Sequence, residues 1–257
     1  MTNILFFKTF DKDENILLRF HLEPSKSLEN NMSIVEYLNT NKQIKKVVTD
    51  NDRHSSYDVE VDLPLTGRMF ITKNPSTKEI GGESEKRFLN ESYEDYLQTR
   101  QKIDMHNLGW IYNIIEGRTE QQNIISNCPD YLLIKNFTWT NDNIKNMQLL
   151  GIVKDKNIMS LRDLTLEHVP LLKRIRTDAL EQIERVYGIG QDKVNMFFHY
   201  PPSAYLLHIH FVHVDVQNHM TCVDKCHSLD RVIHNITLDT DYYRNDMRIC
   251  VTITSKL

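Results

Sequence analysis

The chain has 257 residues, and its 31 basic and 35 acidic side chains give a formal net charge of −4 at pH 7. This length allows one or two domains, and a composition of 40% apolar and 26% charged residues supports a sizeable core. We therefore exclude a disordered chain and a basic protein that coats long nucleic acid, and expect no membrane helix, since no apolar run approaches the roughly 18 residues needed.

The first part of the sequence predicts a small, mainly β unit. Residues 3–10 and 15–21 are rich in apolar side chains and flank a charged turn, which is typical of a hairpin. Residues 47–61 contain two strand-like stretches around a polar turn, and Met69–Ile71 indicates a further strand. A short helix is expected at Ile34–Leu38, because a serine that can cap it comes directly before.

A polar segment separates this unit from the rest of the chain. Residues 73–85 contain few apolar side chains and include Gly81 and Gly82, so they predict a linker or hinge. We therefore expect an N-terminal domain over residues 1–84 and a C-terminal domain over residues 85–257.

The second part of the sequence mixes helices with strands. Residues 84–103 are compatible with a helix, and 165–187 is the clearest helix, with an apolar 3.6-residue period between Thr165 as the N-cap and Gly188. Strands are expected at 194–199, 205–214 and 248–254, and a further helix is expected at 229–236. Helices between strands indicate an α+β or α/β class.

Cysteine usage and the first residues predict the compartment. The four cysteines are Cys128, Cys222, Cys226 and Cys250. They form no disulfide framework for a chain of this size, which favours a reducing intracellular setting. The apolar start is interrupted by Lys8 and lacks a small-residue cleavage site, so we expect no signal peptide. We predict a cytoplasmic protein and leave the nucleus open, because residues 42–46 make a poor basic import signal.

Residues 205–213 carry the main chemical signal. Successive side chains of a strand alternate between faces, so His208 and His210 share one face and His213 lies on the other. A neutral imidazole held there can attack phosphorus, and a second can donate hydrogen bonds to phosphate oxygens. The pair alone does not separate a catalytic role from a structural one. It could also share a zinc ion, but the only other cluster, 222–227, lacks a standard zinc spacing, so we expect no metal.

A longer run around these histidines makes the signal more specific. Residues 199–211 resemble the active strand of the scavenger mRNA-decapping enzymes, a family of the histidine triad superfamily. Further segments resemble this family in the same order, namely 51–57, 110–115, 131–139 and 160–172. The resemblance implies an α+β protein with a C-terminal antiparallel sheet and long helix, and a mainly β N-terminal domain that exchanges strands in a homodimer.

The resemblance also implies an activity and a phosphate site. The family hydrolyses the triphosphate bridge of a capped dinucleotide or short capped RNA and releases 7-methylguanosine monophosphate. His208 matches the nucleophile that forms a covalent intermediate, and His210 and His199 match phosphate-binding histidines. Ser203 matches a serine that contacts phosphate, and Lys225 stands where the family has an arginine. The implied chemistry needs no cofactor.

The resemblance places the cap base between aromatic side chains. Methylation makes the guanine ring cationic, so stacking on an aromatic ring gains about 0.5–2 kcal/mol. Trp110 matches the stacking tryptophan, and Phe137 lies where the family has an apolar residue on the opposite face. Glu120 matches the acid that accepts hydrogen bonds from the base, and Asn51 matches an asparagine of the N-terminal domain.

Besides Lys225, three further departures from the family leave alternatives open. Leu206 occupies the position of the first histidine of the triad, Thr138 replaces a lysine near the phosphates, and Asn136 replaces an aspartate. One alternative is therefore a protein that binds cap or dinucleotide without turnover. Another is a hydrolase of dinucleoside polyphosphates, against which Trp110, Phe137 and Glu120 argue.

Overall fold

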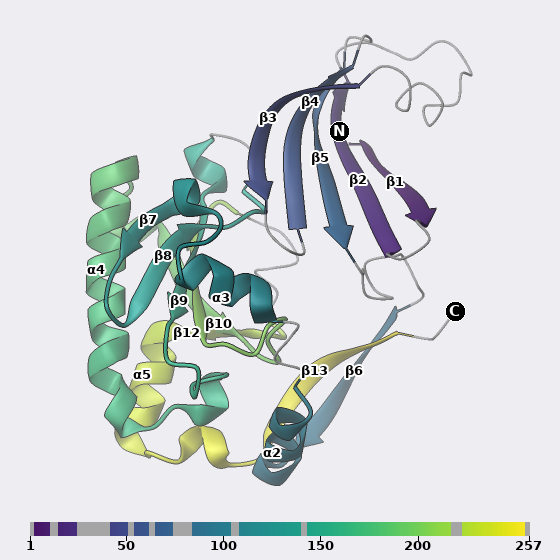
Figure 1. Ribbon diagram of the computed structural model, residues 1–257. Coiled ribbons are helices and arrows are strands. Elements are labelled where there is room, and N and C mark those ends of the chain that lie inside the picture. The colour runs from purple at the N-terminus through teal and green to yellow at the C-terminus, as the bar shows by residue number, and fades with distance from the viewer. Residues whose placement is uncertain are drawn as a thin grey trace. The chain divides into compact units, whose positions relative to one another are not determined.

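The structure is a computed structural model, and its described parts begin at residue 3 (Figure 1). The described residues are 3–10, 15–24, 42–50, 54–61, 65–73, 84–103, 108–139, 143–216 and 223–254, with side chains described from residue 85 onward. Contacts divide the chain into two compact units, which are Met1–Glu85 with Gly117–Glu120 and Thr254–Leu257, and Lys86–Glu116 with Gln121–Ile253.

The first unit contains a five-stranded antiparallel sheet in the order β1-β2-β5-β4-β3. Its strands are β1 (Asn3–Phe10), β2 (Asn15–Pro24), β3 (Lys42–Asp50), β4 (His54–Val61) and β5 (Leu65–Lys73). The predicted hairpin is confirmed as β1 and β2, and the two strand-like stretches within 47–61 are confirmed as parts of β3 and β4. The expected helix at 34–38, most of the expected linker and Asn51 lie outside the described residues.

The second unit is built on a six-stranded antiparallel sheet in the order β12-β10-β11-β9-β8-β7. These strands are β7 (Ile124–Asn127), β8 (Tyr131–Lys135), β9 (Gln148–Val153), β10 (Val194–His199), β11 (His208–His213) and β12 (Cys226–Ser228). Its helices are α2 (Tyr93–Gln101), α3 (Gly109–Ile115), α4 (Val169–Tyr187) and α5 (Leu229–Leu238). The α+β class is therefore confirmed.

Helices cover both faces of this sheet, with α4 and α5 on one side and α3 on the other (Figure 1). α4 buries a stripe made by Leu172, Ile175 and Ile183 against alternate residues of the strands, including Ile209 and Phe211. The other face carries a smaller apolar cluster under α3. Because strand residues alternate, successive residues of β11 point to one face of the sheet or to the other.

The predicted long helix is confirmed, although its first residues form a separate turn. Residues 166–168 are a 3-10 turn, in which the N–H of Thr165 donates to Nδ1 of His168 at 3.0 Å. α4 then begins with Pro170 in its first turn, where the missing N–H costs no hydrogen bond. It ends at Tyr187, and the capping residue that follows, Gly188, has a left-handed φ of 66°, which suits a residue without a side chain.

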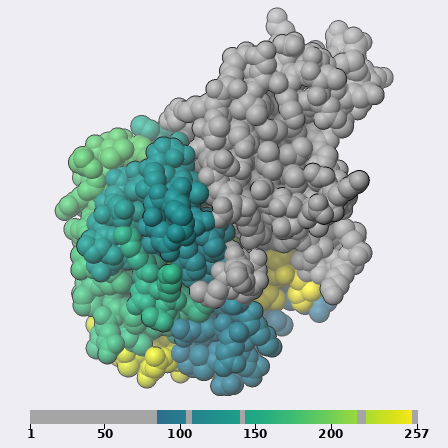
Figure 2. Space-filling view, in the orientation of Figure 1, coloured from purple at the N-terminus to yellow at the C-terminus, as the bar shows by residue number. Residues whose placement is uncertain are grey.

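The expected helix at 84–103 is wrong in its first half. The structure has strand β6 (Ser84–Glu91) there, which pairs with the last strand, β13 (Met247–Thr254). Figure 2 shows the C-terminal segment, in yellow, beside the blue segment that begins this unit. Ser92 then caps α2 by accepting a hydrogen bond from the N–H of Asp95 at 3.1 Å. Pairing with a strand far along the chain overrides the local helical pattern.

Candidate active site

Three histidines lie together on the α3 face of the sheet, at the ends of β10 and β11. His210 pairs directly with Phe197, which places the last residue of β10, His199, next to His210. The ring centroids of His199 and His210 are 4.2 Å apart, and those of His208 and His210 are 5.2 Å apart. The shared face predicted from strand alternation is therefore confirmed.

The main chain fixes the tautomer of His208. Its Nδ1 lies 2.8 Å from the carbonyl oxygen of Leu206. A carbonyl can only accept a hydrogen bond, so Nδ1 carries the proton and Nε2 keeps its lone pair. Burial lowers the pKa of His208 below its usual value, against a smaller opposite effect of this hydrogen bond. The ring is therefore neutral at pH 7 and has one nucleophilic nitrogen.

His210 is buried and lacks hydrogen-bond partners on either ring nitrogen within the described residues. Its ring stacks on Phe197, with centroids 5.2 Å apart and planes 8° apart. Burial, followed by the neighbouring His208 and His199, holds its pKa well below the usual value. A buried polar atom without a hydrogen-bond partner costs about 1–3 kcal/mol of folding free energy. A ligand oxygen that accepted a hydrogen bond from this ring would therefore bind favourably.

Leu206 takes part in an apolar cluster on the same face. It is 1% exposed and packs with Leu132, Ile134, Ile152 and the buried side chains of α3. Its carbonyl group orients His208, although its side chain cannot form a hydrogen bond. Sequence reasoning missed this role, because a main-chain carbonyl leaves no mark on residue identity.

Trp110 lies in α3 and is partly buried against the cluster that contains Leu206 and Ile152. Ile152 pairs with His208 across β9 and β11. Trp110 and His208 are therefore attached to the same apolar cluster at one end of the sheet, although they are 98 positions apart in the sequence (208 − 110). An indole and an imidazole that both adjoin this cluster suit a ligand with an aromatic part and a phosphate.

The residues after β8 form a hydrogen-bonded turn. Asn136 is buried, and its side-chain oxygen accepts a hydrogen bond from the N–H of Thr138 at 3.1 Å. The Thr138 hydroxyl bonds the amide oxygen of Gln148 at 3.1 Å. Phe137 is 38% exposed and so can meet a ligand. The N–H of Asn136 donates to the carbonyl of Gln148 at 2.9 Å, so its main chain stays bonded to the start of β9.

Lys135 lies on the opposite face and does not replace the lysine that Thr138 lacks. Its ammonium nitrogen is 4.4 Å from the centre of the Trp139 ring, in a cation–π contact. Alternation along β8 puts it with Tyr131 and Leu133, which belong to the core under α4.

The other predicted site residues occupy separate places. Ser203 is exposed in the segment that joins β10 to β11. Lys225 is partly buried, and its carbonyl accepts a hydrogen bond from the N–H of Tyr200 at 2.9 Å, so its main chain adjoins the end of β10. Glu120 is buried, has a φ of 55° and groups with the first unit. Asn51 lies outside the described residues.

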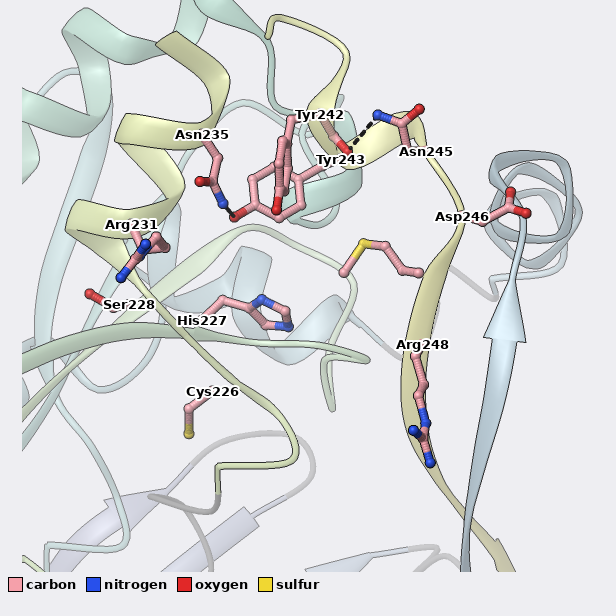
Figure 3. A pocket seen from close by; sticks show the side chains of 11 residues that line it. Cys226, His227, Ser228, Arg231, Asn235, Tyr242, Tyr243, Asn245, Asp246 and Arg248 are labelled. Atoms are coloured by element: carbon pink, nitrogen blue, oxygen red, sulfur yellow. Dashed lines mark hydrogen bonds between the residues drawn. The ribbon is translucent and has the colours of Figure 1, made fainter. Parts of the chain in front are cut away.

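A cavity of about 620 Å³ lies on the other face of the sheet, between β12, α5 and β13 (Figure 3). His227 pairs with Phe198, whose side chain belongs to the core under α4, so His227 faces away from His199, His208 and His210. Figure 3 shows His227 below the ring of Tyr243, with the side chain of Cys226 directed away from it. This cavity is therefore separate from the three-histidine cluster.

Comparisons with known proteins agree with this geometry. A family model described as "Scavenger mRNA decapping enzyme C-term binding" matches residues 109–225, the range that holds Trp110 and the three histidines. The chain is 36% identical to an m7GpppX diphosphatase of Ascaris suum over 222 residues, covering 82% of this chain and 72% of the relative. It is 30% identical to that of Caenorhabditis elegans, with shares of 82% and 71%, and 32% identical to that of Homo sapiens, with shares of 76% and 60%.

Proposed function

Because the chain belongs to the scavenger mRNA decapping enzyme family, we propose that it hydrolyses the triphosphate bridge of cap dinucleotides or short capped RNA fragments. One product is 7-methylguanosine monophosphate, and the other is a nucleoside diphosphate or the shortened RNA. The observation that carries this proposal is the neutral His208, whose Nε2 lone pair is left available by the hydrogen bond of Nδ1 to Leu206.

The reaction proceeds in two displacements. Nε2 of His208 attacks the phosphorus that is attached to the methylated nucleoside, and a nitrogen–phosphorus bond forms. The bond from this phosphorus to the bridging oxygen breaks, and the diphosphate leaves with the electron pair. Water then attacks the same phosphorus and gives up a proton to the solvent. The nitrogen–phosphorus bond breaks, and its electron pair returns to Nε2, which restores neutral His208. The Leu206 carbonyl stabilises the positive charge that the ring gains in the first step.

His210 and His199 bind the phosphate that is being transferred. His210 is buried beside His208 and has ring nitrogens available for a ligand within the described residues, so a phosphate oxygen gives it the partner it lacks. His199 adjoins it at 4.2 Å and extends the same surface. Ser203 and Lys225 contribute a hydroxyl and a cation from neighbouring segments. Donors placed in advance of the reaction stabilise charge that develops in the transition state.

The methylated base stacks on Trp110. The cationic ring gains about 0.5–2 kcal/mol from an aromatic face, and Phe137 covers the opposite side of the base. Glu120 accepts hydrogen bonds from the base edge, and Asn51 matches the asparagine that the N-terminal domain of the family contributes. Asn136 holds the turn that carries Phe137, through its bond to Thr138. Lys135 does not replace the lysine that the family has at the position of Thr138. We therefore expect weaker phosphate binding than in relatives that keep this lysine.

The assembly follows from the family and stays a prediction. We propose an N-terminal domain over 1–84, a C-terminal domain over 85–257, and a cytoplasmic homodimer in which the N-terminal domains exchange strands. Among the described residues no helix is long and apolar enough to cross a membrane.

Product analysis on a methylated cap dinucleotide, with a chelator present, tests the proposed function. We expect 7-methylguanosine monophosphate as product, full activity in chelator, and no product from His208→Asn. The matched control is His234→Asn, which changes an exposed histidine on α5. Cap binding without product after long incubation would establish the binding-protein alternative instead, and an absolute need for divalent metal would contradict the mechanism.

A further inference from the structure

A buried hydrogen bond ties the end of β10 to strand β6. Tyr200 directly follows His199, is 1% exposed, and donates its hydroxyl proton to the carboxylate of Glu91. Its N–H also donates to the carbonyl of Lys225 at 2.9 Å. Both the main chain and the side chain of Tyr200 are thereby fixed at the point where β10 ends.

The acceptor of this bond is itself held by buried charge. Glu91 is the last residue of β6 and is 8% exposed, and its carboxylate lies 3.6 Å from Nε of Arg162. Arg162 is fully buried, and its Nη1 donates to the carbonyl of Asn245 at 2.6 Å. A buried carboxylate needs such a partner, because an uncompensated charge in the core is strongly unfavourable. Glu91 is therefore a fixed acceptor for Tyr200.

The geometry connects this bond to the site. Consecutive strand residues point to opposite faces, so Tyr200 reaches into the core while His199 projects toward His210. Burial, followed by the Glu91 carboxylate, raises the pKa of Tyr200 far above its usual value, which keeps the hydroxyl protonated as a donor. Fixing the Tyr200 ring thus fixes the backbone from which His199 projects.

We propose that Tyr200 and Glu91 are positioning residues that hold His199 in its place beside His210, where it meets the substrate phosphate. This role rests on the proposed function. Sequence reasoning did not find it, because Glu91 and Tyr200 are 109 positions apart and Glu91 lies outside the run of residues 199–211 that contains Tyr200.

Tyr200→Phe removes only the hydroxyl group and tests this role. We expect kcat on a methylated cap dinucleotide to fall about tenfold, because a small displacement of a side chain that binds the phosphate lowers the reaction rate. KM should change less than about twofold. The matched control is Tyr243→Phe, which removes another buried hydroxyl that is bonded to Asn235 at 3.1 Å, on the face away from the histidines. The control should keep wild-type kcat, with each variant assayed well below its unfolding midpoint.

A double variant separates positioning from a general loss of stability. In a His199→Ala background, Tyr200→Phe should change kcat by less than about twofold, because effects that act through one group are not additive. A loss of about tenfold that persists in this background would overturn the proposal, as would unchanged kcat in Tyr200→Phe alone.

The imidazole NMR signals of the free protein give a readout that does not depend on activity. Tyr200→Phe should shift or broaden the ring signals of His199, whereas Tyr243→Phe should leave them unchanged. If the wild-type protein did not hydrolyse cap dinucleotide, the proposed function would be refuted. The His199 signals would still decide whether Tyr200 positions this ring. Unchanged His199 signals in Tyr200→Phe would refute the positioning role.

Discussion

At the scale of single residues, the site depends on which nitrogen of His208 carries a proton. The sequence predicted the histidines and their shared face, because strand alternation follows from residue order alone. It could not predict the bond from Nδ1 to the Leu206 carbonyl, since a main-chain contact does not depend on the side chain at that position. Leucine at position 206 therefore leaves the ring of His208 oriented.

The lowered pKa of His208 gives a pH prediction. Burial favours the neutral ring, so the nucleophile stays unprotonated as the pH falls through the ordinary histidine value of 6.5. We expect kcat/KM to stay level down to that pH and to decline only below it, as Nε2 becomes protonated. Fold stability also declines there, because the unfolded chain binds more protons than the folded one. A pH–rate profile of the free enzyme measures this, and a midpoint above 6.5 would contradict it.

Restoring the family's histidine should not improve this enzyme. In Leu206→His a polar ring replaces leucine in an apolar cluster at a position that is 1% exposed, which should cost about 1–3 kcal/mol of folding free energy. The carbonyl at position 206 still orients His208, so kcat should not rise. Thermal unfolding and steady-state kinetics on a cap dinucleotide check both parts. A large rise in kcat with unchanged stability would show that the leucine side chain limits catalysis.

At the scale of elements, the sequence predicted the strands and helices that are stabilised by residues close to them in the chain. The hairpin of β1 and β2 and the amphipathic α4 are such cases. β6 is not, because it pairs with β13, more than 150 positions later. In β6 the apolar residues Phe88 and Leu89 are adjacent, so the sequence lacks the alternation of apolar and polar residues that predicts a strand. Both side chains are about half exposed in the structure.

The close approach of α4 to the sheet gives a prediction for Gly151 in β9. A Cβ atom there would lie 2.9 Å from the Phe211 ring and 3.6 Å from Ile175, so Gly151→Ala forces the ring to move. Overpacking of this kind costs about 1–3 kcal/mol, which corresponds to about 2–4 °C in Tm per kcal/mol. Gly109→Ala in α3 is the matched control, because nothing lies within 4 Å of its added carbon. Equal Tm values for both variants would contradict this packing.

At the scale of the whole molecule, the sequence predicts that a linker allows the two domains to move. Gly81 and Gly82 lie in that linker and outside the described residues. If closure of the domains controls turnover, then a proline at either position, which restricts the backbone, should lower kcat more than cap affinity. Steady-state kinetics and equilibrium binding of a non-hydrolysable cap analogue measure the two effects. Equal losses in both would argue against a hinge role.

The covalent intermediate is the claim on which the whole account depends. A single-turnover reaction with methylated cap dinucleotide, quenched in alkaline denaturant within the first turnover, can be followed by intact-protein mass spectrometry. We predict a transient increase in mass equal to one 7-methylguanosine monophosphate group, located on His208 and absent from His208→Asn. Complete product formation with no such species at any time, or a labelled residue other than His208, would contradict the mechanism.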